Sequence, residues 1–290
     1  MLFHENTATK LLTIARTGRN RGGSEHNAYC PNDTDAETHS YAESIRKSLG
    51  LSGNTKLLLG AAWASHQQQR MFSMFPEALC ADVTMGTNAE KRPLLVMTSK
   101  TSKNKIVRVF QALMPSQCRW IFDWCFREAF VKLHGVKAVE RNKIILTDGD
   151  SQMYSPLVDL ANDCQSPWRN SRYMLCMWHL INRGLKHQHL SEGRLTFLGK
   201  AQFGAVQNWM YSLSDSPETS EEFDLSLKLL YTFLGSDEVL DRQAMGKEMA
   251  EALTNFIMTS IAPKKASIAF FVKLHLRCFN MRTTSNVESE

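Results

Sequence analysis

The chain contains 290 residues, enough for one large domain or two modest ones, and with 43% hydrophobic and 22% charged residues it is not an intrinsically disordered chain. The formal net charge of +5 permits binding to a polyanion but does not identify one. No run of about 18 apolar residues occurs, and the first residues lack the basic-then-apolar order of a signal peptide, so we expect neither a membrane span nor secretion.

The first half of the chain is predicted to be rich in strands. Residues 1–55 are polar with little apolar periodicity, which predicts a flexible N-terminal arm or the remnant of another domain. Residues 57–64 then predict a buried strand or helix leading into the core. Three strand candidates with short connections follow and predict an antiparallel meander: residues 78–83, 93–98 and 105–114.

Helical periodicity becomes more frequent after this meander. Residues 118–134 carry apolar side chains at helical spacing, and Gly135 is predicted to end that helix. Residues 143–146 predict a compact strand, and Ser155 and Pro156 are predicted to cap and begin the helix that follows.

The rest of the chain is predicted to be mostly helical. Residues 172–176 predict one more strand, which turns into a helix over 177–187. Residues 190–280 are mostly helical in pattern, with a break at 214–220. A strand-rich first half followed by helices predicts an α+β or α/β fold with a helical insertion.

Three short acidic stretches lie far apart in the chain. Asp82 ends an apolar run, Asp148 follows the compact strand, and Glu288 follows a Thr/Ser/Asn cluster of the kind that starts a helix. Each has a structural alternative, a strand-end or turn carboxylate for the two Asp and a capping-box residue for Glu288. Asp150 is interpreted as a structural helix cap or turn residue. Converging carboxylates would repel one another unless they held a divalent metal ion.

The acidic stretches are part of a longer series of short strings. In chain order these are ADVTMGTN at 81–88, PLLV at 93–96, IILTDGD at 144–150, CMWH at 176–179 and TTSNVES at 283–289. Together they resemble the MULE domain, the catalytic core of Mutator-like transposases, and the resemblance runs from about Leu57 to the last residue.

This resemblance implies an α/β fold with a ribonuclease-H-like mixed sheet, whose first three strands are antiparallel, flanked by helices. It implies a core over residues 56–189, an all-helical insertion over 190–280 before the last catalytic segment, and the start of a truncated catalytic helix at 281–290. It also implies that Asp82, Asp148 and Glu288 match the catalytic Asp-Asp-Glu set of such enzymes.

The chemistry implied by the family explains these residue types. Carboxylate oxygens suit Mg²⁺ or Mn²⁺, and two such ions about 3.5–4 Å apart activate the attacking water or 3′-hydroxyl and stabilise the leaving oxygen. The resemblance therefore implies cleavage and strand transfer of double-stranded DNA, at terminal inverted repeats and at target DNA. It also implies a nuclear protein, and a homo-oligomer in a transpososome.

Cys176 and His179 match the Cys-x-x-His string of the family. They are spaced for one half of a zinc site, which His187 and His189 could complete, and the alternative is a buried Cys that packs against a hydrogen-bonded His. We favour the alternative, because two ligands do not make a structural zinc site. The seven cysteines form no CxxC pair, which favours a reduced, intracellular protein with mostly buried thiols.

Three functions remain open from the sequence. The first is a metal-dependent DNA transposase that uses Asp82, Asp148 and Glu288. The second is a degenerate or domesticated transposase that binds nucleic acid without cutting it, because no Cys/His zinc module is recognisable on either side of the core. The third is another ribonuclease-H-like nuclease that acts on RNA or hybrid duplex.

Overall fold

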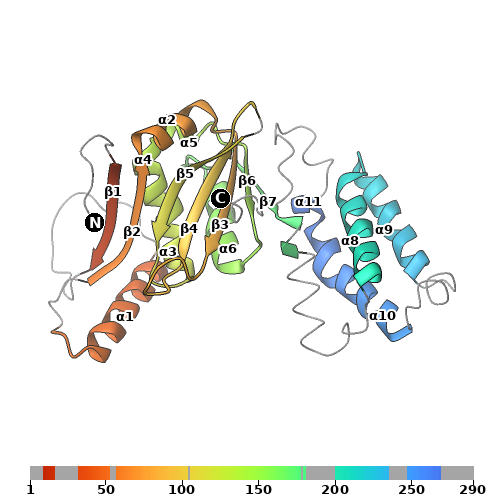
Figure 1. Ribbon diagram of the computed structural model, residues 1–290, viewed down its shortest axis with the longest axis horizontal. Helices are drawn as coiled ribbons and strands as arrows, with labels where there is room; N and C mark the ends of the chain where they lie inside the picture. The colour runs from red at the N-terminus through yellow and green to blue at the C-terminus, as the bar shows by residue number, and fades with distance from the viewer. Residues whose placement is uncertain are drawn as a thin grey trace. The chain divides into compact units, whose positions relative to one another are not determined.

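The computed structural model describes residues 9–16, 32–52, 57–103, 105–177, 179–180, 200–234 and 247–268. Seven strands form one sheet in the order β1-β2-β5-β4-β3-β6-β7 (Figure 1). Their bounds are β1 Thr9–Arg16, β2 Leu57–Ser65, β3 Ala78–Thr84, β4 Leu94–Lys100, β5 Ile106–Leu113, β6 Ile144–Thr147 and β7 Arg172–Leu175. This mixed sheet, flanked by helices, confirms the predicted ribonuclease-H-like fold class.

One side of the sheet is antiparallel. Strand β1 pairs with β2, β2 with β5, β5 with β4, and β4 with β3, each in antiparallel register. The predicted meander is therefore confirmed as β3-β4-β5. The central strands β3 and β4 each bury five consecutive residues, the continuous pattern of strands covered on both faces.

The other side of the sheet is parallel. The backbone N–H groups of Lys143 and Ile144 both donate to the carbonyl oxygen of Glu77, so β3 and β6 start side by side. Neighbouring strands that start at the same level run in the same direction. Strand β7 follows β6 in the same way, because Arg172 N donates to Lys143 O and, four residues on, Cys176 N donates to Thr147 O.

A buried asparagine joins the starts of these three parallel strands. Asn142 is fully buried, and its Nδ2 donates to Pro76 O before β3 at 2.8 Å and to Ile144 O in β6 at 3.2 Å. Its Oδ1 accepts a hydrogen bond of 2.8 Å from the hydroxyl of Ser171, the residue before β7. One side chain thus satisfies buried polar groups from all three strands and sets their relative level.

The helices of the first half are α1 Asn32–Ser48, α2 His66–Met74, α3 Arg119–Asp123, the π-helix η1 Trp124–Phe130, α4 Val131–His134, α5 Val136–Val139 and α6 Ser151–Asn162. The helix predicted over 118–134 is confirmed, with Gly135 after it, but its middle is wound as a π-helix. Aromatic rings join these helices to the sheet. The ring centroid of Phe130 lies 5.0 Å from that of Phe72 in α2, 5.2 Å from that of Phe110 in β5 and 5.3 Å from that of Trp168. This cluster is a large part of the core.

Two features differ from the sequence analysis. Helix α6 starts at Ser151 with Asp150 as its N-cap, so Pro156 lies inside the helix and the predicted start at Ser155 is wrong. The Asp150 carboxylate accepts from Gln152 N at 2.9 Å, which satisfies a donor of the first turn and fixes the earlier start. In addition, β1 and α1 occupy parts of residues 1–55, where the sequence predicted a flexible arm.

The chain divides into two compact units, Met1–Ile145 with Asp150–Arg172, and Leu146–Gly149 with Tyr173–Glu290. The second unit contains α8 Lys200–Asp215, α9 Ser220–Leu234, α10 Lys247–Phe256, the π-helix η4 Ile257–Ile261, the short 3-10 helix η5 Ala262–Lys264 and α11 Lys265–Ile268. The predicted helical pattern and the break near 214–220 are confirmed for this part. No described helix has the length and apolar composition needed to cross a membrane.

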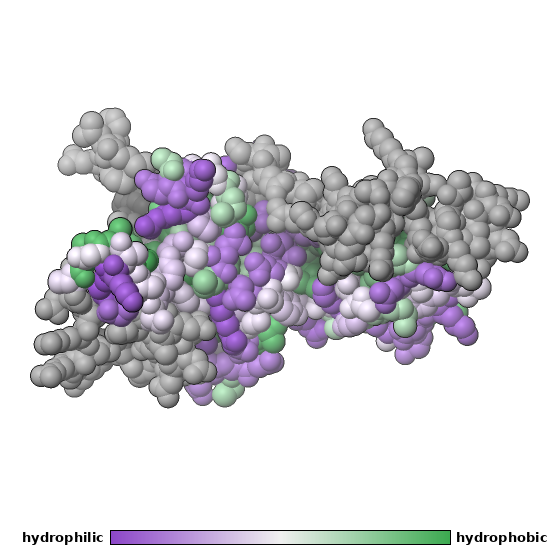
Figure 2. Space-filling model, turned by 90° about the horizontal axis from the view of Figure 1, so that it is seen from below, coloured by the Kyte–Doolittle hydropathy of each residue, from purple (hydrophilic) through white to green (hydrophobic). Residues whose placement is uncertain are grey.

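Three of the described cysteines are buried, and much of the described surface is polar. Cys80, Cys125 and Cys176 are buried thiols that take part in no disulfide, and burial raises the pKa of the Cys125 thiol well above its usual range. On the face that Figure 2 shows, the described residues are mostly hydrophilic. The exposed large apolar side chains of the described residues come from several elements, among them Leu49, Met85, Val136 and Met258.

Candidate carboxylate site

Asp82 is the one carboxylate that is buried among the residues whose burial the structure describes. It is the fifth residue of β3, an inner strand with β4 on one side and β6 on the other, and it is 2% exposed. Its Oδ1 accepts a hydrogen bond of 2.9 Å from the backbone N–H of Val83. A carboxylate in the middle of a sheet is costly to desolvate, so its presence there points to a role beyond solubility.

Asp148 lies at the turn between a strand and a helix. It directly follows the four residues of β6, it is half-buried, and it is succeeded by Gly149 and by Asp150, the N-cap of α6. Asp150 is thus structural, as the sequence analysis interpreted it. The turn holds the backbone of Asp148 between two fixed elements.

Gly149 makes this turn possible. Its φ of +84° is a conformation that residues with a side chain rarely adopt, and a Cβ at this position would meet Leu175 Cδ2 at 3.1 Å. The glycine therefore gives the chain both the left-handed conformation and the close approach to β7 that the turn after Asp148 needs.

Substituting Gly149 with alanine is expected to lower the free energy of unfolding by about 1–3 kcal/mol, because the new methyl group adds backbone strain and a close contact. Chemical denaturation followed by circular dichroism measures the effect. Gly50→Ala, where φ is also positive at +63° but no atom lies within 4 Å, is the matched control and isolates the contact with Leu175. An equal loss in both variants would contradict the steric part of this account.

Each Asp residue comes at the same count along its own strand. Strands β3 and β6 are neighbours that start side by side, and counted from each start both Asp residues come fifth. Carboxylate oxygens at such positions have the chemistry that Mg²⁺ and Mn²⁺ prefer. Within the described residues, no group of three or more His, Cys, Asp or Glu side chains gathers as a metal site.

Cys176 and His179 lie in one turn directly after β7. Cys176 is fully buried and His179 is 2% exposed. Leu180 N donates to Cys176 O at 3.0 Å, so this stretch begins a helical turn in which residues three apart are neighbours. The interpretation of a buried Cys that packs against a hydrogen-bonded His therefore stays a prediction, and the two remaining zinc candidates, His187 and His189, lie outside the described residues.

Glu288, the third member of the predicted Asp-Asp-Glu set, also lies outside the described residues. Of the predicted carboxylates, the structure therefore describes Asp82 and Asp148.

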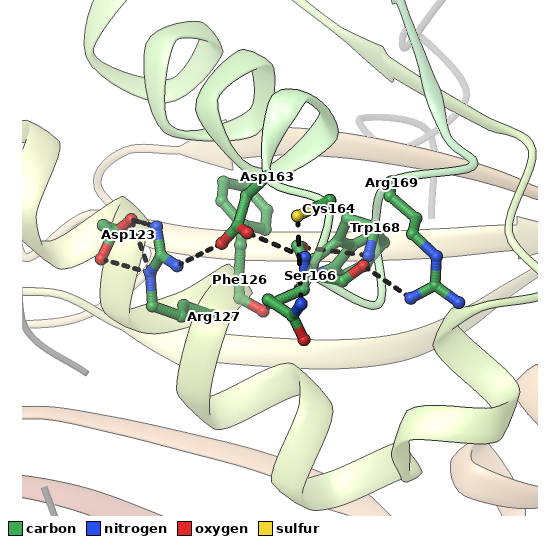
Figure 3. Close-up of polar contacts among 9 residues, drawn as sticks. Asp123, Phe126, Arg127, Asp163, Cys164, Ser166, Trp168 and Arg169 are labelled. Atoms are coloured by element: carbon green, nitrogen blue, oxygen red, sulfur yellow. Dashed lines mark hydrogen bonds and ion pairs between the residues drawn. The ribbon is translucent and has the colours of Figure 1, made fainter. Parts of the chain in front are cut away.

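The sequence analysis missed a polar network between η1 and the segment that leads into β7 (Figure 3). Arg127 lies between two carboxylates, with Nε 3.2 Å from Asp123 Oδ2 and Nη1 3.6 Å from Asp163 Oδ2. Beyond it, the indole N–H of Trp168 donates to Phe126 O at 3.0 Å. The i,i+4 spacing of Asp123 and Arg127 was visible in the sequence, but nothing there indicated the long-range partner Asp163.

Part of the chain matches a known protein family. Residues 38–158 match the family described as "Zinc finger SWIM domain-containing protein 1/3, RNaseH-like domain". The matched residues include β2 to β6 and both Asp82 and Asp148. Over this segment the chain is therefore similar to an RNaseH-like domain of that type, which is related to the cores of Mutator-like transposases. No curated protein matches the chain significantly.

Proposed function

We propose that the chain is a transposase-derived, domesticated protein whose RNaseH-like domain binds double-stranded nucleic acid without cutting it. The observation that carries this proposal is the family match over residues 38–158, because proteins of this type descend from transposases and have been domesticated. The net charge of +5 supports a polyanionic partner.

The test is a binding titration with a fluorescent mixed-sequence DNA duplex at several salt concentrations, followed by incubation with Mg²⁺ or Mn²⁺. We expect binding that weakens linearly on a plot of log affinity against log salt, because Lys and Arg release counterions from the phosphates. We expect no cleaved product with either metal. A chain that does not bind the duplex at low salt would refute the proposal.

A second candidate function is metal-dependent cleavage of nucleic acid. It is supported by the burial of Asp82 inside the sheet and by the place of Asp148 directly after the end of β6. In this function the two carboxylates would hold Mg²⁺ or Mn²⁺, and the bound metal would activate water and stabilise the leaving oxygen. The residues' own contribution would be to fix the ligand oxygens on a rigid sheet.

Metal-linked stability separates the two functions without relying on catalysis. If the carboxylates hold a metal ion, Mn²⁺ at about one hundred times its dissociation constant adds about 2.7 kcal/mol to the stability of the wild type. Asp82→Asn and Asp148→Asn should each abolish this gain, while Asp150→Asn, which keeps a capping oxygen, should retain it. Cleavage by the wild type that both variants lose would replace the binding proposal, and no gain with Mn²⁺ would remove the enzyme candidate.

A further inference from the structure

The end of the sheet where the parallel strands begin carries a concentration of positive charge. Four short segments flank the strands there, residues 75–77, 100–105, 140–143 and 169–172, and all belong to the first compact unit. They contain seven cationic residues and two carboxylates: Lys100, Lys103, Lys105, Arg141, Lys143, Arg169, Arg172, Glu77 and Glu140. Their excess of five positive charges equals the formal net charge of +5 of the whole chain.

The carboxylates at this end are already neutralised. Glu77 pairs with Arg141 at 3.7 Å, and Glu140 pairs with Arg169 at 2.9 Å. Lys103, Lys105, Lys143 and Arg172 are exposed, and none has a carboxylate partner among the described residues. We call these four residues the cationic end.

The backbone beneath the cationic end is held by hydrogen bonds. Thr101 closes the β4–β5 turn, because its N–H donates to Lys105 O at 2.9 Å and its Oγ1 accepts from Lys105 N at 3.2 Å. Lys143 and Arg172 start neighbouring strands, with Arg172 N donating to Lys143 O at 2.8 Å. The charges therefore stand on fixed backbone, which reduces the entropy lost when they engage a ligand.

The spacing of the cationic end suits a row of phosphates. Its residues are spread from the β4–β5 turn across β3 and β6 to β7, and neighbouring strands lie about 4.8 Å apart, so the row extends over roughly 15–20 Å. A nucleic-acid strand presents one negative charge per about 3.4 Å of axis, so several phosphates fall within this length. Compact lysine ammonium groups bind phosphates as point charges and need no exact geometry.

We propose that the cationic end binds the phosphate backbone of a nucleic-acid duplex and is a surface separate from the carboxylate site. Asp82 lies four residues further along β3 than the strand's start, a separation of about 13 Å at 3.3 Å per residue. Contacts here read no base sequence, because they reach phosphates only. This inference rests on the proposed nucleic-acid binding and identifies the surface that performs it.

The test compares the salt dependence of duplex binding between the wild-type chain and two variants that each replace three lysines. In the variant K103Q/K105Q/K143Q, three phosphate contacts disappear, so the slope of log affinity against log salt should fall by about 3, and binding near 0.1 M salt should weaken at least tenfold. The control K47Q/K132Q/K228Q removes the same charge from exposed lysines on α1, α4 and α9, and its slope should fall by less than 1.

The outcomes separate this inference from the proposed function. If the wild type binds the duplex and the two triple glutamine variants show the same salt slope, the assignment of binding to the cationic end is wrong and the proposed function still stands. A wild type that does not bind would overturn both. The variant K103R/K105R/K143R, which keeps the charges, should retain the wild-type slope. Displacement of the duplex by polyglutamate at equal charge concentration would show a surface for acidic protein instead, and would also overturn the inference.

Discussion

Replacing Asn142 with leucine is expected to lower the free energy of unfolding by about 3 kcal/mol. The change leaves the carbonyl of Pro76 without its side-chain donor and leaves the hydroxyl of Ser171 only its longer bond of 3.4 Å to the backbone carbonyl of residue 142. Each buried polar group left unsatisfied costs about 1–3 kcal/mol. Leucine has the same number and branching of side-chain heavy atoms as asparagine and is larger, so the variant leaves no cavity, and the lost hydrogen bonds account for the effect. The measurement is chemical denaturation followed by circular dichroism.

Two further variants make this prediction specific. Ser171→Ala removes one partner and should cost about 1 kcal/mol, because the Oδ1 of Asn142 then lacks a donor while Nδ2 keeps its bonds. Asn170→Leu makes the same substitution at an exposed position and should change stability by less than about 0.5 kcal/mol. Equal stability of Asn142→Leu and the wild type would show that the side chain does not join the strand starts.

The role of Asn142 also shows where sequence reasoning stops. Strand β6 and its Asp148 could be predicted, because three apolar residues and a Thr followed by Asp and Gly have a clear local pattern. The level at which β6 starts beside β3 could not be predicted from the sequence, since it depends on hydrogen bonds between residues 66 apart in the chain.

The other differences between the predicted and the observed elements arise where the local sequence pattern fits more than one structure or depends on a distant partner. Ser155 and Pro156 have a good helix-start pattern, but Asp150 provides an earlier cap, and the helix tolerates Pro156 in its second turn. The apolar spacing of residues 118–134 predicted a helix correctly, yet the same spacing fits an α-helix and a π-helix over the seven residues of η1. Strand β1 escaped prediction because it is an edge strand whose pairing with β2 is a long-range contact.

For the candidate site, the sequence predicted which residues matter, but it did not predict their burial or the backbone turn beside them. Asp82 and Asp148 were found from short strings, and the structure adds the burial of Asp82 and the turn that Gly149 permits. The cationic end could not be found from the sequence, because its four residues come from three segments that only the sheet order places at one end. Likewise, only the structure shows that Glu77 pairs with Arg141 and that Glu140 pairs with Arg169.

Arg127→Met is expected to lower the free energy of unfolding by about 3–5 kcal/mol. The side chains of Arg127, Asp123 and Asp163 are 15%, 14% and 20% exposed, so the variant leaves two largely desolvated carboxylates near each other without their cation. Asp163 also accepts a hydrogen bond of 2.9 Å from Gln165 N in the segment before β7, so the loss should loosen that segment. Thermal and chemical denaturation measure the effect on stability.

The matched control is Arg119→Met, which breaks an ion pair with Asp159 whose two side chains are 51% and 52% exposed, and which should cost about 0–1 kcal/mol. The triple variant R127M/D123N/D163N should recover much of the lost stability, because the uncompensated charges are removed and asparagine at 163 still accepts from Gln165 N. Hydrogen exchange should show faster exchange at Gln165 and Trp168 in Arg127→Met than in Arg119→Met. Equal stability and equal exchange in the two single variants would mean that the Arg127 network does not hold the approach to β7.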